Sequence, residues 1–334
     1  MMRMLCWLFA ACAATTAPPP ASPVAPAPPP AVAESPSAAE APPDSAAPRQ
    51  LAEATPPPVV SKPPPSPPAG PPAWQRYAVV APPTLGRPTL AVVIDDMGLV
   101  PPQSARAVAL PGAVTLSWMP YAPHLADQVA AATARGHEAM LHMPMEALGR
   151  VDPGPDTLRT WLPPPTNLAN LRAALNLLPT AVALSQHDGS VAALSVPLMD
   201  LVMGELAARR MAFLDSPAIP HSVAMGRAEA AGVPAVARDL VIDTDPNPAA
   251  IRARLDEAEA IARRAGHAIL IGHARPTTMD VLEPYLPALA ARGFVLWPIS
   301  ASIAAEAHLD VGPGPAASAG ATAVPPLAAV APVR

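Results

Sequence analysis

Cysteine is nearly absent from this sequence. Of its 334 residues only Cys6 and Cys12 are cysteines, and both lie at the N-terminal end. A disulfide framework or a cysteine-ligated zinc site is therefore excluded from the rest of the chain. Lysine and arginine form no basic cluster and the net charge is −5, so we expect no nucleic-acid partner. The motifs G-x-G-x-x-G, G-x-S-x-G and G-K-[ST] are also missing, which counts against dinucleotide binding, a hydrolase nucleophile elbow and a P-loop.

Aromatic residues and long hydrophobic runs are scarce too. Aromatics make up 3% of the chain, and Trp118, Tyr121 and Trp161 are the candidate platforms for stacking a sugar ring. The apolar stretch in residues 1–14 is too short to span a bilayer. It resembles a secretory signal, and its Phe-Ala-Ala-Cys run resembles a lipoprotein cleavage box that would lipidate Cys12. We expect an exported protein, periplasmic or attached to a membrane facing the periplasm; a merely disordered N-terminus is the alternative.

Proline divides the chain into segments. About half of the 52 prolines precede residue 91, among many alanines and serines. Such a composition cannot bury enough apolar surface to fold, so residues 15–87 are predicted to be a disordered spacer after the signal-like segment 1–14. Residues 306–334 repeat the composition and are predicted to be a tail. One folded domain, residues 88–305, remains.

The domain is built from alternating strand and helix patterns. Its first strand begins at Leu90, is apolar through Ile94 and ends in Asp95 and Asp96. Further buried strands are indicated at 113–118, 138–142, 181–185, 211–216, 233–236, 268–273 and 294–297, with helices between them. About seven to eight parallel strands in an α/β chain predict a distorted (β/α) barrel, in preference to a doubly wound sheet.

Polar side chains stand at the ends of these strands. The carboxyl ends of barrel strands meet at one face, so they should surround a single mouth. Adjacent residues on an extended strand point in opposite directions, so the two aspartates can take different roles. The residues concerned are Asp95, Asp96, His142, His187, Asp215 and His273.

These side chains match the ligands of a catalytic zinc site. Asp96, His142 and His187 supply one carboxylate and two imidazoles, and a fourth position would be left for water. Asp95 could take the proton of that water and His273 could protonate a leaving group. Any single histidine at a strand end is more often a packing or capping residue, and a carboxylate there can cap the next helix. Three histidines with a pair of acids on one rim favour the site.

Several sequence pieces resemble the divergent polysaccharide deacetylase family. They run from Val93–Gly98 through Leu141–Glu146 and Phe213–Ser216 to Ile271–Pro276, and the resemblance covers residues 88–303. It implies a metal-dependent barrel with Asp95 as base, His273 as acid, and Asp96, His142 and His187 as ligands of Zn²⁺. Four further residues are expected to support the site or bind substrate. They are Asp215, Glu146, His124 and Asp188.

The resemblance implies a carbohydrate deacetylase, in which metal-bound water attacks an acetyl carbonyl of an acetylated glycan. The sequence departs from the family at Ser185–Gly189, where two asparagines are usual, and at Ala274, where a proline is usual. The loss of the two amides favours the alternative, a catalytically silent carbohydrate-binding or envelope scaffold protein. A hydrolase for another amide, such as a peptide, is a third hypothesis. The oligomeric state is left open.

Overall fold

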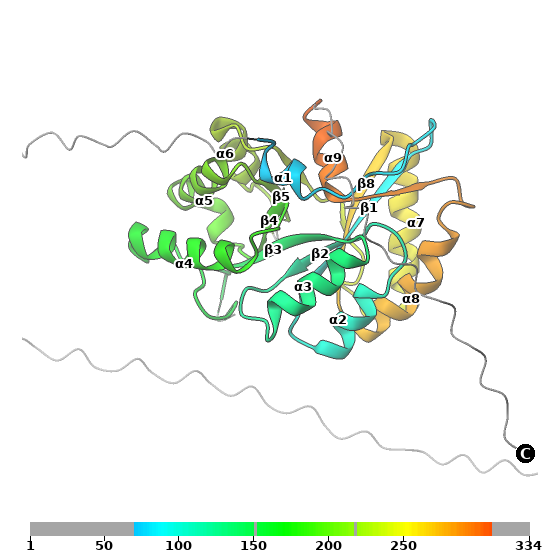
Figure 1. The fold of residues 1–334 in the computed structure, drawn as a ribbon, viewed down its shortest axis with the longest axis horizontal. Coiled ribbons are helices and arrows are strands. Elements are labelled where there is room, and N and C mark those ends of the chain that lie inside the picture. The colour runs from blue at the N-terminus through cyan, green and yellow to red at the C-terminus, as the bar shows by residue number, and fades with distance from the viewer. Residues whose placement is uncertain (1–69, 150–151, 217–218, 309–334) are drawn as a thin grey trace, which may run out of the picture. The chain divides into compact units, whose positions relative to one another are not determined.

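The β-strands of the computed structural model form a parallel sheet that curves into a barrel (Figure 1). The structure describes residues 70–149, 152–216 and 219–308. Every pairing between its named strands is parallel, so the predicted parallel barrel is confirmed. The strands are β1 (Thr89–Met97), β2 (Thr115–Trp118), β3 (Glu138–Met145), β4 (Ala183–Asp188), β5 (Ala212–Asp215), β6 (Ala235–Ala237), β7 (Leu240–Val241), β8 (His267–His273) and β9 (Val295–Trp297).

The chain itself joins the two ends of the sheet. The strand order is β6-β5-β4-β3-β2-β1-β8-β7, with β9 paired to β1. β6 and β7 stand at opposite ends of this order but are separated in sequence only by Arg238 and Asp239. One bent segment therefore pairs with β5 through its first half and with β8 through its second. Among the described strands β6 and β7 do not pair with each other, so the chain and not a strand ladder joins the two ends of the sheet.

Helices cover the outside of the strands in Figure 1. Five of them begin with proline in the first turn, which suits that position because the missing N–H has no helical partner there. Gly232 and Gly266 end α6 and α7 in the left-handed conformation. The helices are α1 (Ala73–Arg76), α2 (Pro101–Val108), α3 (Leu125–Ala134), α4 (Pro164–Leu177), α5 (Val196–Arg209), α6 (Ala224–Ala231), α7 (Pro248–Ala265), α8 (Pro276–Ala288) and α9 (Ile299–Glu306), with a 3₁₀ turn at Ala192–Leu194.

Alternation along each strand separates two apolar clusters. Leu90, Val92 and Ile94 belong to the large cluster formed with the surrounding helices, whereas Ala91 and Val93 belong to a smaller one. The smaller cluster also takes residues from β3, β4, β5 and β8, so it fills the barrel interior. Because the strand repeat is two residues, the next position after Val93 on the same face is Asp95. Strand periodicity thus carries a carboxylate to the top of an apolar interior.

The folded region begins earlier than the sequence predicts. Residues 70–87 were expected in the spacer, but they include α1, and Trp74 is buried in the interior cluster with Ile299 and Ile303 of α9. The backbone N–H of Val79 also donates to Glu138. A single tryptophan supplies the burial that the surrounding proline-rich composition lacks. Neither α1 nor α9 was predicted.

Other expectations differ at element boundaries or lie outside the described residues. The helix expected between the strands at 211–216 and 233–236 begins at Ala224, and β3 continues three residues past His142 to Met145. The signal-like segment 1–14, the spacer up to residue 69 and the tail from residue 309 lie outside the described residues. Among those that are described, no helix is both long and apolar enough to cross a bilayer.

Candidate metal centre

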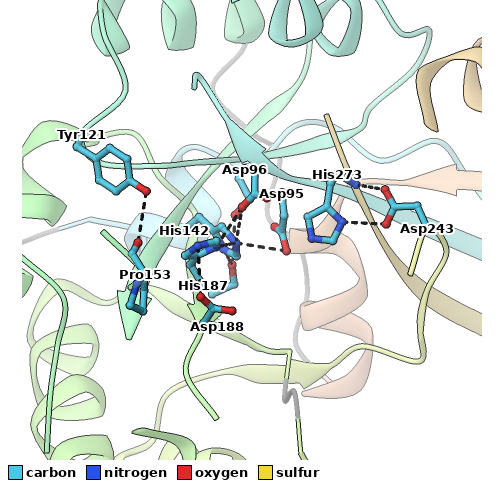
Figure 2. A network of polar contacts seen from close by, with 11 residues as sticks. Asp95, Asp96, Tyr121, His142, Pro153, His187, Asp188, Asp243 and His273 are labelled. Atoms are coloured by element: carbon cyan, nitrogen blue, oxygen red, sulfur yellow. Dashed lines mark hydrogen bonds and ion pairs between the residues drawn. The ribbon is translucent and has the colours of Figure 1, made fainter. Parts of the chain in front are cut away.

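Three of the predicted site residues meet at the carboxyl end of the barrel (Figure 2). Asp96 lies near the end of β1, His142 in β3 and His187 near the end of β4. The Nδ1 atom of His187 is 3.0 Å from Oδ1 of Asp96 and 3.2 Å from Nε2 of His142. The third edge of this triangle, from Nε2 of His142 to Oδ1 of Asp96, is 3.5 Å.

The triangle has the size of one face of a tetrahedral zinc site. Ligand atoms bound to zinc at 2.0–2.2 Å in tetrahedral geometry lie about 3.4 Å apart. The three observed edges, 3.0, 3.2 and 3.5 Å, are close to that separation. Two imidazole nitrogens and a carboxylate oxygen are also a donor set that zinc accepts. The residues present therefore fit a zinc ion by both chemistry and spacing.

Asp96 reaches this triangle through an unusual backbone conformation. Its φ is +58°, in the left-handed region that non-glycine residues rarely adopt. The β1–β2 register also shifts between Ile94 and Met97. In a regular strand the side chain of Asp96 would point away from that of Asp95, as the sequence predicts. The turn at Asp96 instead brings both carboxylates within 4 Å of the same nitrogen, Nε2 of His142.

The electrostatics of the triangle favour a negative carboxylate with a neutral His142. Burial raises the pKa of Asp96, but its hydrogen bond to His187 and the charges of His142 and His187 outweigh burial and hold the pKa well below its usual value. Burial, together with the charge of His187, lowers the pKa of His142 to about 3. Burial also lowers the pKa of His187, but the bond to Asp96 outweighs burial, so this pKa lies above its usual value. At neutral pH His142 is neutral and can offer a lone pair.

Asp95 lies beside the triangle but is not one of its corners. Its Oδ2 is 3.7 Å from Nε2 of His142, and Oδ1 is buried without a hydrogen-bond partner among the described residues. Burial raises the pKa of Asp95 to about 7, although the charge of His273 lowers it. A carboxylate with a pKa near neutrality is suited to accept and release a proton.

His273 stands on the other side of Asp95 in Figure 2. The two residues are register partners on β1 and β8. Nδ1 of His273 is 2.8 Å from Oδ1 of Asp243, and Oδ2 of Asp243 accepts from the backbone N–H of His273 and from the Thr278 hydroxyl. Burial lowers the pKa of His273, but the bond to Asp243 outweighs burial and raises it. Asp243 thus orients His273 and favours its protonated form.

Sequence reasoning missed Asp243. This residue is fully buried and follows the apolar run Leu240–Ile242. The pattern that located the other site residues, a buried strand that ends in a polar side chain, is present here too. It was not recognised because the strand, β7, has only two residues. Arg238 was also not assigned to the site; its positive charge lowers the pKa of Asp215, which burial raises.

The remaining predicted residues are not corners of the triangle. Asp188 lies next to His187, with Oδ2 at 3.7 Å from its Nε2. Asp215 is buried and accepts from the Gln186 amide at 2.6 Å. Glu146 accepts from the backbone N–H and hydroxyl of Thr160, so it fixes the loop after β3. His124 is exposed at the residue before α3.

The aromatic candidates differ in exposure. Trp118 is fully buried, so it is not available to stack on a sugar, because the last residue of β2 packs under the covering helices. Tyr121 is 37% exposed and Trp161 is 67% exposed. The Tyr121 hydroxyl donates to the carbonyl of Pro153, and Arg159 lies over the Trp161 ring. Two of the three candidate platforms therefore remain accessible.

Comparisons with known proteins agree with this fold. Residues 92–303 match the family model described as divergent polysaccharide deacetylase. The uncharacterized protein YibQ of Escherichia coli is 34% identical over 194 residues, which cover 58% of this chain and 61% of YibQ. An uncharacterized protein of Haemophilus influenzae is 31% identical over 194 residues, covering 58% of this chain and 69% of that protein. The chain thus matches about three fifths of the length of YibQ.

A crystal structure shows the same fold. It is that of the uncharacterized protein ATU2773 from Agrobacterium tumefaciens, with a TM-score of 0.65 and 28% sequence identity. The similarity covers 69% of this chain and 94% of that chain.

Proposed function

The chain belongs to the divergent polysaccharide deacetylase family, and we propose that it is a zinc-dependent hydrolase that removes acetyl groups from acetylated carbohydrate. One observation carries the proposal: a carboxylate and two imidazoles face one another at 3.0–3.5 Å, beside a carboxylate with a raised pKa. Asp96, His142 and His187 would hold the metal. Bound zinc would activate a water molecule and polarise the acetyl carbonyl.

The chain's own residues supply the proton transfers. Asp95 is the proton acceptor, because its buried carboxylate lies between the triangle and His273. His273 is the proton donor to the leaving nitrogen or oxygen, since Asp243 holds its Nδ1 and leaves the other ring nitrogen for substrate. Hydrolysis consumes one water and releases acetate. The same two groups would therefore serve N-acetyl and O-acetyl substrates.

Substrate would approach over the loops that follow β2 and β3. Tyr121 and Trp161 belong to these loops and present exposed ring surface. Burial is the main cause of the raised pKa of Tyr121, and the negative charges of Asp96, Asp152 and Asp188 raise it as well. This ring therefore lies within the electrostatic field of the site. Sugar rings stack on such surfaces through their apolar faces.

The test combines metal analysis with an acetate assay. We expect the purified protein to bind about one zinc per chain at the predicted tetrahedral site and to release acetate from N-acetylated or O-acetylated oligosaccharides. Chelation should abolish release and added zinc should restore it. Bound zinc without turnover of any acetylated glycan would favour the scaffold hypothesis, and cleavage of peptides without acetate release would favour the peptidase hypothesis.

We also propose export, from the signal-like segment at residues 1–14. Expression of the full chain with a C-terminal alkaline phosphatase should give phosphatase activity in the periplasm. Activity only after cell lysis would refute export.

A further inference from the structure

Two fully buried serines lie under the candidate metal centre. Ser117 is in β2 and Ser185 in β4, and β3, which carries His142, lies between these strands in the sheet. Their Oγ atoms are 3.2 Å apart. The interior below them is filled by apolar residues such as Val93, Met140 and Ala183. Hydroxyl groups in such an interior are costly unless they are hydrogen-bonded.

Ser185 contacts the ring of His142 on the side away from the triangle. Its Oγ is 2.9 Å from Nδ1 of His142, whereas Nε2 of that ring faces Asp96 and His187. A neutral imidazole has one N–H and one lone pair. If Nδ1 donates to Ser185, the lone pair is on Nε2, where a metal ligand needs it.

The contacts continue from Ser185 to Ser117. When Ser185 accepts from His142, its own O–H is free to donate to Ser117 at 3.2 Å. Ser117 lies on β2 one residue after the register partner of Ile94, and Asp95 follows Ile94 on β1, so these contacts end near Asp95. In this arrangement Ser117 accepts from Ser185, and Nδ1 of His142 is the donor at the start of the chain.

We propose that Ser185 and Ser117 are positioning residues that hold His142 as its Nδ1–H tautomer. The inference rests on the proposed metal site. It extends that site to two residues that touch neither metal nor substrate. Groups that hold a ligating histidine in this way commonly change metal affinity by about 10–100-fold.

Metal affinity tests the role of Ser185. We expect Ser185→Ala to weaken zinc binding about 10–100-fold in a competition titration with a chelator, and Ser185→Thr, which keeps the hydroxyl, to recover most of the loss. Ser117→Ala should weaken zinc less, since the His142–Ser185 contact remains. The matched control is Ser300→Ala, which removes another fully buried hydroxyl, one that donates to Glu138 at the other end of the barrel; its zinc affinity should stay unchanged. Wild-type affinity in Ser185→Ala would overturn the proposal.

A second measurement does not depend on the variants or on metal. Nitrogen-15 NMR of the histidine side chains reports which ring nitrogen carries the proton. Wild-type protein without zinc should show His142 as the Nδ1–H tautomer. An Nε2–H tautomer would refute the positioning role even if zinc binds. Failure of the wild-type protein to bind zinc would refute the proposed function, and the tautomer would still decide the role of Ser185.

Discussion

Two carboxylates are buried at opposite ends of the barrel interior, and they differ in their surroundings. Glu138, at the start of β3, is 1% exposed, and Asp95, near the end of β1, is 2% exposed. Glu138 accepts hydrogen bonds from the backbone N–H groups of Val79 and Ser300 and from the hydroxyls of Ser300 and Thr115. One oxygen of Asp95 has no such partner among the described residues.

This difference assigns a structural role to Glu138 and a chemical role to Asp95. The donors to Glu138 come from the segment before β1, from β2 and from the start of α9, so this carboxylate of β3 joins four parts of the chain. Satisfied buried polar groups cost little and fix a structure. Asp95 carries the cost of burial without full compensation, which raises its pKa. A protein retains such a group where it performs chemistry.

Substituting each carboxylate by its amide is the strongest test of this contrast. Asp95→Asn should reduce acetate release about 10²- to 10⁴-fold, because a positioned general base contributes about that much. Zinc binding should be kept, since Asp95 is not a corner of the triangle. The matched variant Glu138→Gln should keep its activity, measured as kcat/KM on the same acetylated substrate. Full activity in Asp95→Asn would show that the two ends do not differ in this way.

Truncating the carboxylate at the other end should affect stability. Glu138→Ala leaves several buried donors without an acceptor, and we expect a loss of about 3 kcal/mol in the free energy of unfolding. Urea denaturation measures this change. The control is Glu229→Ala on the exposed surface of α6, which should alter stability little. An equal, small effect of both substitutions would mean that Glu138 does not join the segments it contacts.

Zinc bound at the triangle should stabilise the folded protein against unfolding. A ligand that binds only the folded state at one hundred times its Kd adds about 2.7 kcal/mol. The thermal midpoint should therefore rise with zinc in the wild-type protein and in Glu138→Gln, but not in His187→Ala. The control His267→Ala changes an exposed histidine at the start of β8, away from the triangle, and should respond like wild type. Loss of the zinc effect in His267→Ala would place the metal elsewhere.

The sequence predicts the end of the barrel that holds Asp95, because strand periodicity is a strong signal. Apolar runs that end in Asp or His located β1, β3 and β8, and parallel pairing brought their ends together. The carboxylate of Asp243 escaped because the strand before it is two residues long. The conformation of Asp96 escaped for another reason: aspartate adopts a positive φ more often than most non-glycine residues, but tertiary contacts decide at which aspartate this happens.

The other end of the barrel was harder to predict. Its contacts join residues far apart in the chain, such as Val79 with Glu138 and Thr115 with Ile299. Trp74 lies in a proline-rich stretch whose average composition indicates a spacer, yet one large buried side chain anchors it. Composition describes a whole segment, whereas burial is decided residue by residue.

The smallest expected effect is a pH dependence of stability that belongs to Glu138. Burial raises its pKa above the usual 4.5, although the bonds from Ser300, Val79 and Thr115 lower it. Since the folded protein holds this proton more tightly than the unfolded chain, the contribution to stability is fully present below 4.5 and is lost as pH rises through the folded pKa. Glu138→Gln cannot titrate at this position.

The difference in unfolding free energy between wild type and Glu138→Gln should therefore shift against wild type as pH rises. Urea denaturation of both proteins from about pH 4 to pH 8 measures this difference. Asp95, whose pKa is also raised by burial, titrates in both proteins, so its contribution cancels. A difference that stays constant, or that shifts toward wild type as pH rises, would mean that the hydrogen bonds to Glu138 outweigh its burial and that this carboxylate is ionised in the folded protein.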